Sequence, residues 1–228
     1  MTIIYRDDLI QKPLLELINR CISDEKFHWQ SPTSGYSTVS YEYPTKDVLD
    51  IDLKVIDSPQ MVHPLLIGGQ IYSSWFHIFE NLLTDVIGKA FPKSDADWLI
   101  GRAKLNNTFR CHFSDGTYYN PPHVDPYLEE VYENGDFGDK DKQINMLIYF
   151  GDSDGDTFFF EGNEIRKEQH VLTRVSPKNG RVVLFNREQL HASSPPIKSQ
   201  NRFVLNVNFL TSVPLDELYK YIEEEDKP

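Results

Sequence analysis

The sequence has few cysteines and no long apolar run. Only Cys21 and Cys111 occur among the 228 residues, far apart and outside any C-x-x-C pair, which excludes a disulfide framework and a thiolate zinc site. No stretch approaches the roughly 18 consecutive apolar residues of a transmembrane helix. The amino-terminal MTIIYRDDLI lacks the basic and apolar segments of a secretion signal. We therefore expect a cytoplasmic protein that does not span a membrane.

Positive charge is also scarce. Lysine and arginine number 23 against 35 acidic residues, so the net charge is −12. Because affinity for nucleic acid depends on basic side chains that neutralise phosphates, this balance disfavours a nucleic acid partner. The aromatic content of 13%, with 14 prolines and 12 glycines, is typical of a folded, strand-rich chain with many loops. The length predicts a single domain.

Helical spacing dominates the first 97 residues. Pro13 suits the first turn of a helix whose apolar residues are Leu14, Leu17, Ile18 and Cys21. A longer helix is predicted after His63-Pro64, with Gly88 as its stop signal. Its apolar stripe consists of Ile71, Trp75, Ile78, Phe79, Leu82, Leu83 and Val86. Such a stripe is expected to pack against a sheet.

From residue 98 the period changes to two. The stretch LIGRAKLNNTF alternates Arg102, Lys104, Asn106 and Thr108 with Ala103, Leu105 and Asn107. Further strands are predicted at INMLIYF, DTFFFEG, HVLTRVS, RVVLFN and RFVLNVNFL, separated by turns rich in glycine, proline and aspartate. Short strands at this spacing, preceded by helices, predict a jelly-roll or barrel with a helical buttress.

The chain is thus predicted to be mainly β with flanking helices, with a double-stranded β-helix (jelly-roll) core. Residues 1–97 would form the amino-terminal helical buttress, 98–211 the core, and 212–228 a carboxy-terminal helix with an acidic tail. That last helix is indicated by Leu215, Leu218, Tyr219 and Ile222. The acidic segment 126–142 is typical either of a flap beside a site or of a solvated loop.

The short motif His123-Val124-Asp125 could hold a metal. In a strand, residues two apart point to the same face, so an imidazole and a carboxylate could bind one ion together. The same pattern could also be an exposed turn after Pro121-Pro122. A third ligand is indicated by His191, which follows the apolar strand RVVLF through a short loop. The other histidines are more typical of packing or surface positions: His28, His63, His77, His112 and His170.

The last predicted strand adds an arginine to this set. Arg202, Val204, Asn206 and Asn208 share one of its faces, and Arg202 would offer a fork for a carboxylate if that face lines an interior site. Two histidines and one carboxylate leave three adjacent octahedral positions of an ion open. This arrangement is used for non-haem Fe(II) and dioxygen chemistry.

The order His-x-Asp, several strands, His and then Arg resembles the Fe(II)- and 2-oxoglutarate-dependent oxygenase superfamily. The stretches MLIYFGDSDGDTFFFEGN and GRVVLFNREQLHASSPP look like the family's central strand and turn and the strand that delivers its second histidine. GRAKLNNTF and RFVLNVNFL are similar to strands of the prolyl-hydroxylase-like branch found in many phage and bacterial proteins. The resemblance covers residues 100–210 well.

The resemblance implies an enzyme that takes Fe(II), 2-oxoglutarate and O2, with ascorbate as reductant. His123, Asp125 and His191 would be the metal ligands and catalytic residues, and Arg202 would pair with the distal carboxylate of 2-oxoglutarate. The remaining candidates for contact with 2-oxoglutarate are Lys104, Asn106, Tyr119 and Asn206. Of these, Lys104, Asn106 and Asn206 are equally compatible with ordinary polar positions on a half-exposed strand. The product set would be a hydroxylated substrate, succinate and CO2, the substrate being a peptidyl proline or a small molecule.

Two alternatives from other classes remain open. The same three ligands suit the catalytic zinc of a hydrolase, although that reading needs a general base and leaves Arg202 without a role. A jelly-roll could also be a non-catalytic binding module with the histidines and Asp125 on its surface. Nothing in the sequence indicates an oligomeric state.

Overall fold

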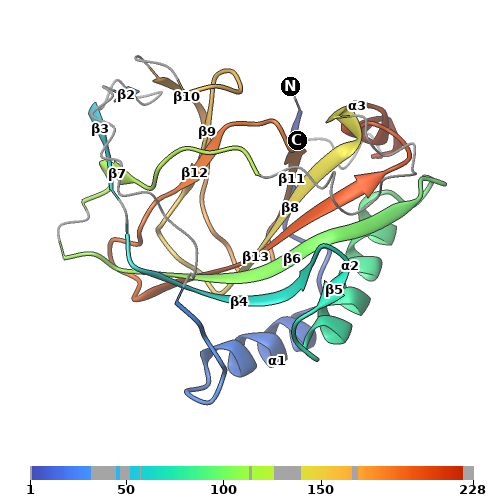
Figure 1. Cartoon of the computed structure of the whole chain (residues 1–228), viewed down its shortest axis with the longest axis horizontal. Helices are drawn as coiled ribbons and strands as arrows, with labels where there is room; N and C mark the ends of the chain where they lie inside the picture. Colours follow the sequence, from blue (N-terminus) through green and yellow to red (C-terminus); the bar gives the residue numbers. More distant parts are fainter. Residues whose placement is uncertain are drawn as a thin grey trace.

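The computed structural model describes residues 2–31, 45–46, 52–56, 58–112, 115–125, 140–165 and 169–222 (Figure 1). The predicted flap 126–142 therefore lies outside the described residues except for a short 3-10 helix, η3 (Lys140–Lys142). The predicted acidic tail also lies outside them from residue 223 onward.

Two sheets form the core of the fold, and they carry the jelly-roll architecture that the sequence predicts. The large sheet has the order β1 (Ile3–Arg6), β11 (Val182–Asn186), β8 (Gln143–Phe150), β13 (Asn201–Thr211), β6 (Trp98–Phe109), β4 (Gln60–Ile67), β5 (Gln70–Ile71). The small sheet has the order β12 (His191–Ser193), β9 (Thr157–Phe160), β10 (Gln169–Val175), β2 (Thr45–Lys46), β3 (Asp52–Val55), β7 (Tyr118–Tyr119).

Strands β6 and β13 run antiparallel side by side in the middle of the large sheet. Lys104 lies opposite Asn206, and Thr108 lies opposite Arg202. The alternation predicted for β6 is confirmed, because Ala103 and Leu105 are fully buried whereas Lys104 is only partly buried. One face of the pair therefore joins the apolar core, and the other carries polar side chains toward the space between the sheets.

Two helices, α1 (Lys12–Ser23) and α2 (Phe76–Ala90), cover the outer face of the large sheet (Figure 1). Their apolar residues share one core cluster with Leu105, Leu205 and Phe209 of the sheet. The first-turn position of Pro13 is confirmed. The predicted face of α1 is wrong by about one residue, because Leu15, Ile18 and Ile22 are buried while Leu17 is 49% exposed. Two apolar stripes overlap in this helix, and only contact with the sheet selects one of them.

The first 97 residues also contribute strands, which the helical prediction missed. β1, β4 and β5 all join the large sheet. Ile71, predicted to be helical, lies in β5, and α2 begins only at Phe76 and continues past Gly88 to Ala90. β4 was not predicted because it contains Pro64, and proline lacks the N–H that pairing in a sheet requires. The register between β4 and β6 shifts just after Pro64. The predicted division of the chain at residues 97 and 211 stays a prediction.

The carboxy-terminal helix is confirmed in a shorter form. α3 (Leu215–Leu218) is followed by a 3-10 helix, η4 (Tyr219–Tyr221). Leu215, Leu218 and Ile222 are buried in the same core cluster as the two long helices. Among the helices in the described part of the chain, none has the length and apolar character needed to cross a bilayer.

Candidate metal centre

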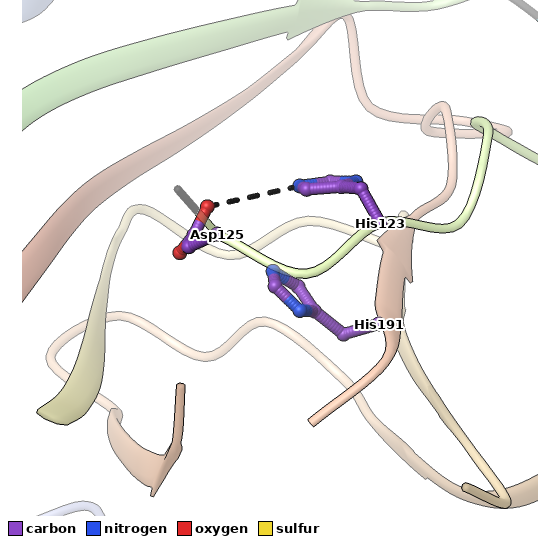
Figure 2. A group of neighbouring side chains, drawn as sticks. All are labelled: His123, Asp125 and His191. Atoms are coloured by element: carbon purple, nitrogen blue, oxygen red, sulfur yellow. Dashed lines mark ion pairs between the residues drawn. The ribbon is translucent and has the colours of Figure 1, made fainter. Parts of the chain in front are cut away.

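The three predicted metal ligands converge between the two sheets. One candidate ligand atom from each of His123, Asp125 and His191 lies within 4.8 Å of the others. Figure 2 shows the His123 ring directed toward the Asp125 carboxylate, with the His191 ring beside both. His191 opens β12, whereas His123 and Asp125 follow β7. These two segments pair reciprocally through the backbone. The backbone N–H of each histidine donates to the carbonyl oxygen of the other at 3.0 Å.

Backbone contacts fix the orientation of both imidazole rings. Nδ1 of His123 lies 3.1 Å from the carbonyl oxygen of Pro121, and Nδ1 of His191 lies 2.9 Å from that of Gln189. A carbonyl can only accept, so each Nδ1 carries a hydrogen, and in the neutral ring the lone pair then lies on Nε2. Nε2 of His123 is 3.9 Å from Oδ1 of Asp125. This tautomer, held by an outer contact, is the form in which histidine binds a metal.

Burial favours the neutral form of His191. The side chain is 4% exposed, and burial, assisted by the neighbouring His123, lowers its pKa to about 4. At neutral pH the imidazole is therefore uncharged and able to donate its lone pair. The His123 side chain, by contrast, is 50% exposed, so the site has one edge open toward solvent.

Asp125 is ionised despite its burial. It is 3% exposed, and burial by itself would raise its pKa. At the acidic pH where the carboxyl would titrate, the positive charges of His191, His123 and Arg102 outweigh burial and hold the pKa well below its usual range. Nη1 of Arg102 lies 3.9 Å from Oδ1. The site therefore presents the uncharged imidazole of His191, the imidazole of His123 and one carboxylate.

Two asparagines of β13 hold the other carboxylate oxygen. Nδ2 of Asn208 donates to Oδ2 of Asp125 at 3.0 Å, and Nδ2 of Asn206 lies 3.5 Å from the same oxygen. Asn208 also donates to Oδ1 of Asn145 in β8, its cross-strand partner, at 2.6 Å. The sequence analysis placed Asn208 on the polar face of its strand but gave it no role. Its position two residues after Asn206, on the same face of the strand, was the signal that could have identified it as a second contact of the site.

Arg202 is buried and held in one orientation. Its Nε donates to the carbonyl oxygen of Gly155 at 2.7 Å, and its Nη2 donates to Oγ1 of Thr157 at 2.6 Å. The hydroxyl of Tyr149 lies 2.6 Å from the same Oγ1, and the guanidinium carbon lies 5.3 Å from the centre of the Tyr149 ring. A Cβ on Gly155 would lie 2.6 Å from the carbonyl oxygen of Ser194 and 3.1 Å from Cδ of Arg202. Only glycine therefore lets the backbone at position 155 lie this close to Ser194 and Arg202.

One pocket unites most of the predicted site. It is lined by Lys104, Asn106, Asn206 and Arg202 together with His123, His191 and Thr157. Tyr119 is not among the lining residues. It is 1% exposed and packs against Phe158 and Phe160, with ring centres 5.7 and 5.3 Å away. The tyrosine beside Arg202 is Tyr149, which the sequence analysis did not single out because it lies in a mostly apolar strand, β8, that is buried along its whole length.

Among the described residues, the remaining histidines take no part in this cluster. His63 is buried, with Nδ1 2.6 Å from the carbonyl oxygen of His28 and Nε2 2.9 Å from Oγ of Ser73. Burial lowers its pKa. Both ring nitrogens are engaged, so His63 has a structural role in the core.

Comparison with known proteins points to one superfamily. Residues 108–210, which contain all three candidate ligands and Arg202, match the family model described as the 2OG-Fe(II) oxygenase superfamily. No curated protein matches the sequence. At the level of structure, an oxidoreductase of the 2OG-Fe(II) oxygenase family from Burkholderia pseudomallei is similar with a TM-score of 0.56 and 14% identity, over 91% of this chain and 85% of the other.

Two further solved structures share the fold. The non-haem α-ketoglutarate-dependent carbocyclase SnoK from nogalamycin biosynthesis is 8% identical over 99% of this chain and 88% of its own, with a TM-score of 0.55. A prolyl hydroxylase from Trichoplax adhaerens, in complex with a hypoxia-inducible factor peptide fragment, is 11% identical over 91% of this chain and 83% of its own, with a TM-score of 0.50. At these identities the likeness shows the fold.

Proposed function

The chain belongs to the 2OG-Fe(II) oxygenase superfamily, and from this premise we propose that it hydroxylates a peptidyl proline or a small molecule. It is an Fe(II)- and 2-oxoglutarate-dependent dioxygenase, and its cofactors are Fe(II), 2-oxoglutarate and O2. In the balanced reaction one oxygen atom enters a substrate C–H bond, and the other enters succinate as 2-oxoglutarate loses CO2. The single observation that carries the proposal is the convergence of His123, Asp125 and His191 at a pocket that both histidines line together with Arg202.

The donor set fits Fe(II). Nε2 of His123, Nε2 of His191 and Oδ1 of Asp125 would hold the ion, because the other ring nitrogens are engaged with carbonyls and Oδ2 is engaged by Asn208. Two imidazoles and one monodentate carboxylate leave open positions for co-substrate and dioxygen. When bound, the iron supplies the activation of dioxygen. The protein's own part is to hold the three ligands, orient both substrates and exclude water.

We infer that Arg202 binds the distal carboxylate of 2-oxoglutarate. Gly155 and Thr157 already fix the guanidinium, so little side-chain entropy is lost when an anion arrives. Thr157 and Tyr149 extend this anchor with two hydroxyl groups. In this proposal Tyr149 takes the place that the sequence analysis gave to Tyr119. Asn106 and Asn206 line the same pocket and would flank the chain of the co-substrate.

The two alternative functions are less well supported. A zinc hydrolase needs a general base, and the described residues that line the pocket include no glutamate or aspartate for this role. A binding module on a similar fold would not need the convergence of three metal-binding side chains at a pocket that contains a buried arginine. The two cysteines are unpaired, which is compatible with our proposal of a cytoplasmic location.

Succinate formation from 2-oxoglutarate tests the proposed function. The purified protein is supplied with Fe(II), ascorbate and 2-oxoglutarate, with candidate peptides, amino acids and other small molecules added in turn. We expect turnover with Fe(II) and none with Zn(II). His123→Ala and His191→Ala should abolish both turnover and metal binding, whereas His170→Ala, on an exposed position of β10, serves as the matched control. Full activity and full metal binding in both ligand variants would show that the site is wrongly assigned.

A further inference from the structure

Lys104 carries a positive charge in the pocket that no described residue pairs. Its side chain lines the same pocket as His123 and His191. Lys104 makes no hydrogen bond or ion pair with the residues that the structure describes. Burial, together with the charge of Arg102, lowers its pKa to about 8, and Asp125 acts in the opposite direction. The ammonium group of Lys104 therefore faces the pocket without a partner among the described residues, an arrangement that favours binding of an anion.

The strand register places Lys104 and Arg202 at opposite ends of the pocket. Lys104 lies opposite Asn206 in the β6 and β13 pair, whereas Arg202 lies four residues earlier on β13, opposite Thr108. At about 3.4 Å per residue this is a separation of roughly 13 Å along the strand. Asn206 and Asn208 contact Asp125, so the metal ligands lie at the Lys104 end. A 2-oxoglutarate molecule that reaches from the metal to Arg202 therefore extends away from Lys104.

The charges of the described residues in and beside the pocket do not balance once the cofactors are bound. The two charges of Fe(II) are offset by the two carboxylates of 2-oxoglutarate. The carboxylate of Asp125 offsets only one of the three cationic side chains Arg102, Lys104 and Arg202. Asp156, whose charge also acts on Arg202, lies 3.9 Å from Arg174 and is offset by it. A site that keeps excess positive charge in a partly dry cleft attracts an anionic ligand.

We propose that Lys104, assisted by Arg102, binds a free carboxylate of the primary substrate, which is therefore an anionic small molecule such as an amino acid or an oxo acid. The inference rests on the proposed function and specifies the substrate class for the same site. In this proposal Lys104 serves the primary substrate, whereas the sequence-based prediction that it serves the co-substrate is the alternative that the experiment below distinguishes. A peptidyl proline with its neutral backbone would leave the ammonium unpaired.

A matched pair of small probes tests this subsite without knowledge of the substrate. Acetate and acetamide have similar shape and differ in charge. Each is titrated by calorimetry into the Zn(II) form loaded with 2-oxoglutarate, which does not turn over. We expect acetate to bind with a dissociation constant in the millimolar range and acetamide to bind at least about 10-fold more weakly. Loss of a charge-assisted hydrogen bond in Lys104→Met should weaken acetate binding by about 10- to 100-fold.

Two controls accompany the Lys104→Met variant. Lys104→Arg keeps the charge and should retain the preference for acetate over acetamide. Lys12→Met makes the same change in net charge on α1, where the side chain is 85% exposed, and should bind acetate as the wild type does. Thermal melting of each variant separates a lost subsite from a failure to fold, and the comparison of acetate with acetamide in the wild type does not depend on any variant.

Three outcomes would overturn the proposal. Acetate could fail to bind at concentrations up to about 100 mM. Acetate could bind Lys104→Met as tightly as it binds the wild type, which would place the anion on the metal. Acetate could bind the Zn(II) form that lacks 2-oxoglutarate but not the form loaded with it, which would assign Lys104 to the co-substrate. A failure of the proposed function itself is seen separately, as absence of succinate formation by the wild-type Fe(II) protein.

Discussion

Asn208 donates a hydrogen bond to Oδ2 of Asp125 at 3.0 Å, from one strand of the large sheet to the loop that carries two candidate metal ligands. The same amide group donates to Asn145 at 2.6 Å, so both of its hydrogens are used. Asn208 is 1% exposed and Asn145 is fully buried. The contact leaves Oδ1 as the oxygen of Asp125 that faces His123 and Arg102, whose nearest nitrogens each lie 3.9 Å away. We infer that Asn208 thereby selects the carboxylate oxygen that would face the metal.

We expect Asn208→Ala to weaken metal binding by about 10- to 100-fold, the usual effect of removing an outer partner of a metal ligand. Mn(II) titration by calorimetry measures this loss without any turnover. Asn107→Ala is the matched control, because Asn107 is equally buried, at 3% exposure. Its neighbours on β6, Asn106 and Thr108, line the pocket, so the side chain of Asn107 points to the opposite face of the sheet. Equal Mn(II) affinity in Asn208→Ala and the wild type would contradict the assigned role.

Gly155→Ala should impair co-substrate binding selectively. The added methyl group would collide with the carbonyl oxygen of Ser194 and with Cδ of Arg202. We expect Arg202 to shift and the KM for 2-oxoglutarate to rise by about 10-fold or more, because a charge-assisted contact is lost, with Mn(II) affinity retained.

A second glycine provides the control for that substitution. A Cβ at Gly88 in α2 would meet no atom within 4 Å, so Gly88→Ala should leave KM unchanged and stabilise the protein by about 0.5–1 kcal/mol. An unchanged KM in Gly155→Ala would show that the close approach to Arg202 does not matter for the co-substrate.

A lysine at position 202 should not take over the function of the arginine. A lysine has a single nitrogen and cannot contact Gly155, Thr157 and a carboxylate in the planar geometry of a guanidinium. We expect the KM for 2-oxoglutarate to rise by about 10- to 100-fold in Arg202→Lys and at least as much in Arg202→Met. Steady-state succinate formation at varied 2-oxoglutarate measures both. If KM is unchanged in Arg202→Met, the distal carboxylate binds elsewhere.

Stability in acid should depend on Asp7. Hydrogen bonds from Arg181 at 2.6 and 2.9 Å, with one from Lys178 at 2.8 Å, lower the pKa of Asp7 to about 2 from 3.8. Because the folded-state pKa is depressed, the contribution is complete above the unfolded value and is lost as pH falls from about 5 toward 2. Asp7 is 30% exposed, so we expect only about 1 kcal/mol.

Urea denaturation at pH 6 and pH 3 measures this contribution. Asp7→Asn should be less stable than the wild type at pH 6 and should differ less from it at pH 3. Asp95→Asn, at an exposed position, is the control and should show no such convergence. A constant difference between Asp7→Asn and the wild type at both pH values would exclude ionisation of Asp7 as the cause.

Much of the fold was predictable because strand and helix periodicity is local. Residues two apart in β6 share a face in any sheet, so the alternation of Lys104 and Leu105 was visible in the sequence. The strand β4 was missed because Pro64 interrupts its pattern, and the buried face of α1 was misplaced because Leu14 and Leu15 offer two similar stripes. The strand conformation of β4 and the buried face of α1 both depend on the neighbouring element against which each segment packs.

The sequence by itself determined the chemistry that the site could have: the His-x-Asp spacing, a later histidine, and an arginine on a polar strand face. Only the tertiary structure decided that His191 meets His123, through reciprocal backbone hydrogen bonds, and that Asn208 rather than solvent holds Asp125. It also separated Lys104 from Arg202 along the pocket. The physical reason is that a strand fixes which way its own side chains point, whereas their partners come from long-range pairing between segments that are distant in the chain.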